Sequence, residues 1–145
     1  MGALSKQPKT LNPQIHDCFM RYIALLLGLL FLLFAYWQFN DPDPVWWVTI
    51  YLVAAYCSYR AFMGKFNLEL LAVLAVLYAA GTLNAWLQIT AWEGFFSEGS
   101  GLAMKSMNQE LARESAGLGI CLAAVLLFLA TGWVHRRKAL FGVPK

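Results

Sequence analysis

The chain has 145 residues, of which 60% are hydrophobic and 13% charged, and its formal net charge is +3. Soluble globular domains contain about 45–50% apolar and about 25% charged residues. Together with a mean hydropathy of +0.56, this composition excludes an ordinary water-soluble domain. It predicts a small integral membrane protein with one structural unit.

Four long apolar segments follow one another along the chain, at residues 22–39, 45–62, 68–89 and 116–134. A helix of 18 residues covers about 27 Å, close to the ~30 Å hydrocarbon core of a bilayer. We therefore predict an all-α membrane protein, a four-transmembrane-helix bundle. Its transmembrane domain covers residues 22–134, with an N-terminal segment at 1–21, an outer loop or amphipathic helix at 90–115 and a basic tail at 135–145.

Basic residues are concentrated on one side of this predicted topology. Nine of the 11 lysines and arginines fall in the N-terminal segment, the loop at 63–67 and the C-terminal tail, or at the helix ends beside them. Six of the eight acidic residues fall on the opposite side. The positive-inside rule then places both termini in the cytoplasm. We expect a multi-pass protein of the cell or inner membrane, and the positive charge gives no reason to expect nucleic acid as a partner.

Proline and asparagine mark the expected ends of the first three helices. Asn12-Pro13 begins the first helix and Asp41-Pro42 ends it, because proline cannot continue a helix. Asp43 is the expected N-cap of the second helix, with Pro44 at its first position. Asn67 is the expected N-cap of the third helix.

The last helix is expected to begin well before its apolar segment. Ser106 and Gln109 have the spacing of a capping box. No helix-breaking residue lies between Met104 and Ala116. We therefore favour one continuous helix that runs from the outer surface into the membrane.

Small residues recur at helical spacing in every apolar segment, and such stripes let membrane helices approach closely. They indicate packing within one bundle, with a homodimer contact as the alternative. The stripes are Ala24 and Gly28; Ala54, Ser58 and Ala61; Ala72, Ala75, Ala79 and Thr82; and Gly117, Cys121 and Ala124.

Polar residues gather towards the outer side, whereas no charged residue lies in the middle of a segment. Ion pumps and coupled transporters usually need such a charge, so those classes are disfavoured. Tryptophans at the same depth indicate an aromatic belt. We name the following residues the outer polar cluster: Gln38, Asn40, Asp41, Asp43, Asn84, Gln88, Glu110, Arg113 and Glu114.

This cluster admits more than one interpretation. Asn84 pairs with Gln38 across helices or lines a pocket open to the outside. Asp41, Asp43 and Asn40 either offer oxygen ligands to a divalent cation or belong to a polar network that holds the hairpin against the last helix. We expect no catalytic residue, no resident metal and no cofactor.

Two sequence blocks resemble the transmembrane protein 220 family. Residues 34–44 read Phe-Ala-Tyr-Trp-Gln-Phe-Asn-Asp-Pro-Asp-Pro and are followed by Trp47 and Tyr51. The second block places Glu110, Arg113, Glu114, Gly117 and Leu118 ahead of the last segment. The resemblance covers roughly residues 20–135 and implies a four-helix membrane protein without an established biochemical activity. The positions that match the family are Gln38, Asn40, Asp41, Asp43, Glu110, Arg113 and Glu114.

Three functions are compatible with these features. We favour a non-enzymatic bundle in the lipid bilayer whose outer polar cluster contacts a membrane protein partner, a second copy or a lipid headgroup. The alternative is a small-molecule or metal-binding site open to the outside, as in a carrier component. A third is an enzyme at the membrane interface, with Glu110 or Glu114 as acid or base.

Overall fold

The computed structural model describes residues 13–40, 43–95 and 106–141, and every regular element in them is helical. The elements are α1 (Pro13–Trp37), the short 3-10 helix η1 (Gln38–Asn40), α2 (Pro44–Phe62), α3 (Leu68–Leu87) and α4 (Met107–Leu140). With 34 residues, α4 is about 51 Å long and exceeds the ~30 Å thickness of a hydrocarbon core.

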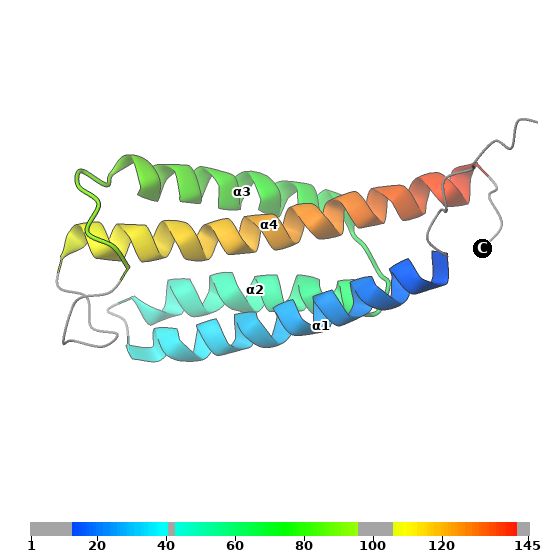
Figure 1. The fold of residues 1–145 in the computed structure, drawn as a ribbon, viewed down its shortest axis with the longest axis horizontal. Coiled ribbons are helices and arrows are strands. Elements are labelled where there is room, and N and C mark those ends of the chain that lie inside the picture. The colour runs from blue at the N-terminus through cyan, green and yellow to red at the C-terminus, as the bar shows by residue number, and fades with distance from the viewer. Residues whose placement is uncertain (1–12, 41–42, 96–105, 142–145) are drawn as a thin grey trace, which may run out of the picture.

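The helices form two antiparallel hairpins that lie against each other (Figure 1). One hairpin consists of α1 and α2, the other of α3 and α4, and the helices within each hairpin make the most extensive contacts. The hairpins meet where α2 packs against α4. At one end, the basic end, α1 and α3 begin while α2 and α4 end. At the other, the acidic end, α1 and α3 end while α2 and α4 begin.

Two tyrosines hold the hairpins together. The Tyr78 hydroxyl of α3 donates a hydrogen bond of 3.0 Å to the Ile50 carbonyl of α2. Tyr51 of α2 packs directly against Gly117 of α4, where a Cβ atom would lie 3.3 Å from the ring carbon that carries the hydroxyl. Both tyrosine side chains are almost fully buried. The space for Tyr51 therefore exists because residue 117 has no side chain.

Small residues permit the close approach inside each hairpin. A Cβ atom at Gly28 of α1 would lie 3.4 Å from the Ser58 Cβ of α2. Ser58 is fully buried, and its hydroxyl donates to the Ala54 carbonyl one turn earlier, at 2.9 Å. Hydroxyl groups that bond within their own helix are satisfied without water, as a membrane interior requires.

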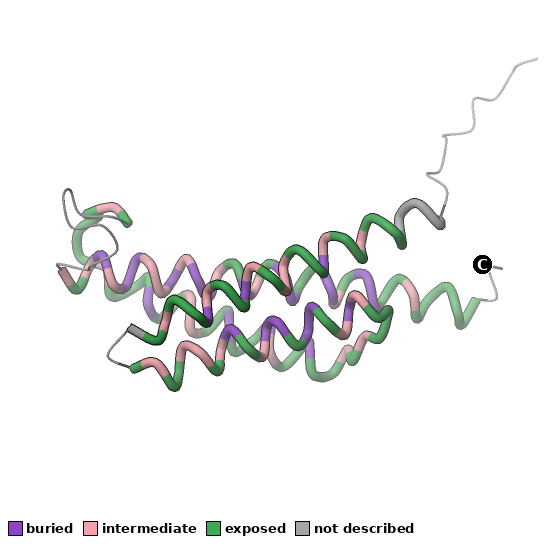
Figure 2. The backbone as a smooth tube through the Cα atoms, turned by 90° about the horizontal axis from the view of Figure 1, so that it is seen from below, coloured by how far each residue is buried: buried purple, intermediate pink, exposed green. Residues whose placement is uncertain are grey.

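Buried and exposed positions alternate along the helices (Figure 2), and many of the exposed ones are large apolar residues. Leu26 is 68% exposed, Val76 69% and Leu87 72%. Apolar exposure on this scale along whole helices is typical of a surface that faces lipid. The helix α4 is more buried than α1 or α3, since 44% of its most apolar stretch is buried, against 17% for each of those two.

Three helices of the described residues are long and apolar enough to cross a membrane: Asp17–Trp37, Leu68–Leu87 and Met107–Leu140. The fourth, α2, is not among them. Its 19 residues include Arg60 and five tryptophans and tyrosines, which lower its hydropathy.

Asn67, Ser106 and Asp43 all occupy the predicted N-cap positions, but only the first two cap their helices through the side chain. The Asn67 side chain accepts from the Leu70 backbone N–H at 3.1 Å, and the Ser106 hydroxyl accepts from the Gln109 backbone N–H at 3.3 Å. Asp43 makes no side-chain cap hydrogen bond. Its φ of −117° and ψ of 56° depart from the extended conformation that directs a cap side chain at the helix N–H groups.

The predicted continuity of the last helix is confirmed, because α4 runs unbroken from Met107 to Leu140. The stripe predicted for the third segment is partly wrong. Ala75 is buried and Thr82 lies beside Gly119 of α4, whereas Ala72 and Ala79 are exposed.

Replacement of Gly117 by alanine tests the contact between the hairpins. Gly117→Ala places a methyl group against the Tyr51 hydroxyl, so we expect the free energy of unfolding to fall by about 1–3 kcal/mol, the usual cost of overpacking. Thermal unfolding of the full chain in detergent measures this change.

Tyr51→Phe, which removes that hydroxyl, should recover part of the loss in the double variant. The control is Gly119→Ala, because the atom nearest to the new Cβ would be Thr82 Cγ2, at an ordinary 3.9 Å. Equal losses for the two alanine variants would contradict the proposed contact.

Candidate functional site

The acidic end of the bundle holds the outer polar cluster, and most of its described members are partly accessible. Gln38 lies in η1 and is half-buried, and Asp43 is exposed just before α2. Glu110, Arg113 and Glu114 lie in the first turns of α4 and are half-buried. Arg113 and Glu114 are each engaged with a neighbouring group. The structure thus places these residues at one end without making them a single closed site.

Asn84 and Gln88 lie apart from the others, on the exposed face of α3 and just beyond its end. The Gln88 side-chain amide donates to the Asn84 backbone carbonyl at 3.1 Å. In the described part of the chain, the side-chain amide of Asn84 has no hydrogen-bond partner, and no bond joins it to Gln38. The cross-helix pairing of these two amides is therefore absent from this structure.

The cation-site interpretation rests partly on residues outside the described ranges. Asp41 lies there entirely, and nothing is described of the Asn40 side chain. Among the residues that are described, no three histidine, cysteine, aspartate or glutamate side chains lie close enough together to hold a metal ion.

A second polar cluster joins the segment after α3 to the start of α4. The Glu93 carboxylate accepts hydrogen bonds from the Ser106 hydroxyl and from the Asn108 amide, the latter at 3.0 Å. The Asn108 carbonyl oxygen accepts from the Thr90 backbone N–H at 3.1 Å and from the Thr90 hydroxyl at 3.2 Å. We name Thr90, Glu93, Ser106 and Asn108 the loop clasp.

The loop clasp has a favourable electrostatic position. Ser106 caps α4, so Glu93 lies beside the positive end of the helix dipole. The hydrogen bonds from Ser106 and then Asn108 lower the pKa of the Glu93 carboxyl below its ordinary 4.5. The clasp therefore fixes the entry into α4 most firmly when Glu93 is ionised.

Sequence reasoning identified Ser106 as a cap but missed its connection to Glu93. The two residues are 13 positions apart in the sequence, separated by a glycine- and serine-containing segment. An acidic residue ahead of a helix N-terminus was the available signal. That signal alone does not say which acidic residue pairs with Ser106, because the pairing depends on the path of the loop.

Aromatic side chains surround this end. The rings of Trp86 and Trp92 are 6.2 Å apart, and Phe95 meets Trp92 edge-on at 5.1 Å. Trp37 and Trp46 are exposed at the facing ends of α1 and α2. Tryptophan at the ends of apolar helices is typical of the membrane–water interface.

Long apolar helices with a lipid-like exterior, aromatic ends and polar caps define a helical membrane protein. Comparison with models of protein families then identifies the family to which the chain belongs. The model described as "Transmembrane family 220, helix" matches residues 30–130, and the chain belongs to this family. The match confirms the resemblance inferred from the two motif blocks. Comparisons with curated proteins and with solved structures gave no match.

Acid titration tests the loop clasp. Because the folded-state pKa of Glu93 is lowered, its stabilising effect is complete above the ordinary value of 4.5 and disappears as the pH falls through the lowered value. We expect the midpoint of thermal unfolding to drop in this acid range, and Glu93→Gln to lose that part of the pH dependence.

The matched control is Glu69→Gln at the other end of α3, which should keep the acid-dependent drop. Ser106→Ala removes the helix cap as well, so it should cost about 1 kcal/mol even at neutral pH. An unchanged acid profile in Glu93→Gln would disprove the assigned role.

Proposed function

We propose that the protein is a non-enzymatic membrane bundle of four spans that binds a neighbouring membrane helix through the exposed face of α3. The partner belongs to another membrane protein or to a second copy of the chain. Both termini face the cytoplasm, and the outer polar cluster lies on the opposite side.

The observation that carries this proposal is the position of Asn84. It lies in an apolar helix and is exposed among Leu83, Trp86 and Leu87, which are more than half exposed. An amide that faces hydrocarbon without a partner is unfavourable. A hydrogen bond across a helix pair satisfies the amide and contributes about 1–2 kcal/mol in model membrane peptides. A partner helix against this face would supply that bond.

The partner-binding proposal predicts that Asn84→Leu weakens association without lowering the stability of the isolated protein. Native mass spectrometry of the full chain, extracted gently from its own membrane, measures the association. We expect an added mass of protein size in the wild type and its loss in Asn84→Leu.

Asn84→Gln retains the amide and is the matched control, so it should keep much of the association. The added mass separates a homodimer from a heteromeric complex. A bare chain in the wild type, or a metal or small molecule retained in stoichiometric amount, would overturn the proposal.

The packing of α2 supports its assignment as a fourth span despite its lower hydropathy. It lies antiparallel to α1 along most of that helix (Figure 1). Its only charged residue, Arg60, lies in the last turn, where the guanidinium is 5.9 Å from the Tyr56 ring centroid. Arginine near the end of a span can reach the interface with its head group.

Cysteine accessibility tests the four-span topology. In a Cys18→Ser background, Asp43→Cys and Met107→Cys should react with a membrane-impermeant maleimide in intact cells. Lys65→Cys should react only after permeabilisation. The native Cys57 and Cys121 are buried and serve as the background. Labelling of positions 43 and 65 from the same side would contradict the assignment of α2 as a span.

A further inference from the structure

An apolar groove runs between α1 and α2 on the outer surface of their hairpin. Its volume is about 340 Å³, and it is lined by Ala24, Leu25, Gly28, Leu29, Leu32, Leu52, Ala55, Tyr56, Tyr59 and Phe62. On α2, the distance from Leu52 to Phe62 corresponds to about 15 Å along the helix axis. The groove therefore follows the direction of a lipid chain, and it reaches the basic end at Phe62, the last residue of α2.

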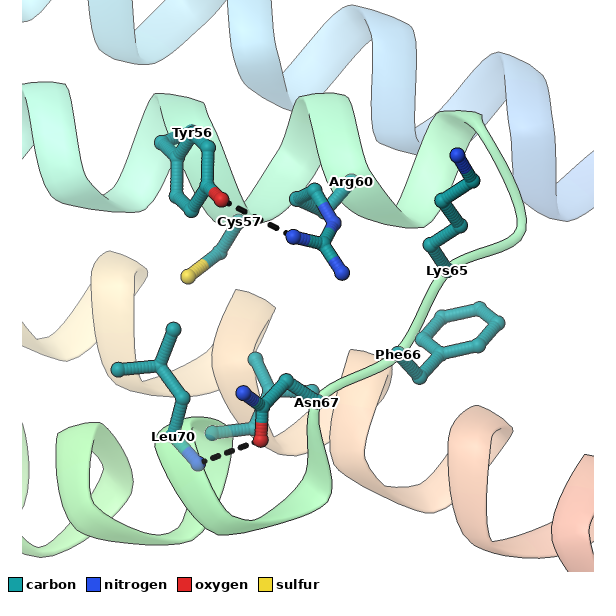
Figure 3. Close-up of a pocket in the computed structure, with 8 residues that line it drawn as sticks. Tyr56, Cys57, Arg60, Lys65, Phe66, Asn67 and Leu70 are labelled. Carbon is teal, nitrogen blue, oxygen red and sulfur yellow. Dashed lines mark hydrogen bonds between the residues drawn. The ribbon is translucent and has the colours of Figure 1, made fainter.

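A small pocket with two cationic residues in its wall lies between α2 and the start of α3, and it shares Tyr56 with the groove. It is lined by Tyr56, Cys57, Arg60, Lys65, Phe66, Asn67, Leu70 and Leu71. Figure 3 shows Arg60 reaching from α2 into the gap that Asn67 and Leu70 border from the start of α3. The free volume of about 20 Å³ has room for about one water-sized group, such as one oxygen of a larger ligand.

Arg60 is incompletely satisfied in this pocket. One terminal nitrogen of its guanidinium donates to the Tyr56 hydroxyl at 3.0 Å. Its Nε is buried and has no hydrogen-bond partner. In the described residues, neither Arg60 nor Lys65 forms an ion pair with a carboxylate. An arginine with free donors in a partly buried site is suited to a phosphate or carboxylate, which accept its planar fork of N–H groups.

The surroundings of the pocket also favour an anion. The first turn of α3 points its positive dipole end into this region, and the Asn67 side chain caps it. The basic end contains two described acidic residues, Asp17 and Glu69, and neither lines the pocket or the groove. Asp17 is instead paired with His135, at 3.2 Å.

Tyr56 connects the two cavities, since it lines both of them and receives the hydrogen bond from Arg60. On the other side of the groove, Arg21 precedes Leu25 by one turn of α1 and is exposed. Cationic side chains therefore lie at the basic end of the apolar groove. This arrangement matches a phospholipid, in which a charged headgroup is joined to an apolar chain.

We propose that the groove and the pocket together bind one anionic phospholipid. The phosphate lies against Arg60 and Lys65, and one acyl chain occupies the groove between α1 and α2. The groove lies on the α1–α2 hairpin, and the pocket involves only the start of α3, at the opposite end of that helix from Asn84. The lipid proposal therefore stands or falls independently of partner binding.

Lipid titration by native mass spectrometry tests the headgroup part of the site. The purified full chain in detergent is titrated with phosphatidylglycerol and with phosphatidylcholine that carry the same acyl chains. We expect binding of phosphatidylglycerol to be favoured and to weaken about tenfold in Arg60→Gln, the loss that corresponds to one hydrogen bond to a charged group. Lys65→Gln, in an exposed loop, should weaken the same preference without affecting folding.

Arg136→Gln is the matched control, because it removes a basic residue at the same end that lines neither cavity. Equal affinity of the wild type for the two lipids would overturn the proposal. So would an unchanged preference in both Arg60→Gln and Lys65→Gln.

A groove variant distinguishes a lipid from a free anion. Leu52→Trp fills the groove and should weaken binding of phosphatidylglycerol, whereas Leu77→Trp on the exposed face of α3 should leave it unchanged. Inorganic phosphate at millimolar concentration should not displace the lipid. Displacement by phosphate, or binding that Leu52→Trp does not affect, would identify a site for free phosphate and overturn the lipid assignment.

Discussion

The contact between the two hairpins is the constraint on which the rest of the structure depends. Tyr51 fits against α4 because Gly117 leaves room for it, and Tyr78 reaches across from α3 to the Ile50 carbonyl. In lipid, apolar area drives little association between helices, so shape and hydrogen bonds must supply the specificity. The rings of the two tyrosines supply the shape complementarity, and the Tyr78 hydroxyl supplies a hydrogen bond. They also fix how far one hairpin is shifted against the other along the bundle axis, and therefore where both polar ends lie.

Much of this arrangement could be predicted from the sequence. Apolar segments, proline and cap residues predicted four helices in the right order, and the caps at Asn67 and Ser106 were correct. Which face of each helix meets which neighbour was less predictable. The helix α3 is apolar on most of its surface, so the sequence does not show which of its alanines face a neighbour, and of Ala72, Ala75 and Ala79 only Ala75 is buried. Asp43 takes the N-cap position of α2 as predicted, but its φ and ψ keep the side chain from the cap hydrogen bond, and residue types alone do not specify those angles.

The candidate sites show the same division. Motif and charge predicted the outer polar cluster, and its described members Gln38, Asp43, Glu110, Arg113 and Glu114 lie in η1, just before α2 and at the start of α4. The loop clasp and the pocket around Arg60 were missed, since each joins residues from different elements. In the sequence, Arg60 is only one of the nine basic residues on the predicted inner side. Its buried, unpaired Nε is visible only once Tyr56 and the start of α3 are in place.

The division into two hairpins also affects how the protein is made. During synthesis, α1 and α2 can pair as soon as Phe62 has left the ribosome, because each is the other's main neighbour. Gly117 follows 55 residues later, which takes roughly 3–11 seconds at common elongation rates of about 5–20 residues per second. Throughout that interval, the face of α2 around Tyr51 lacks its permanent neighbour. That face is therefore the part of the first hairpin that stays uncovered between the completion of α2 and the arrival of α4.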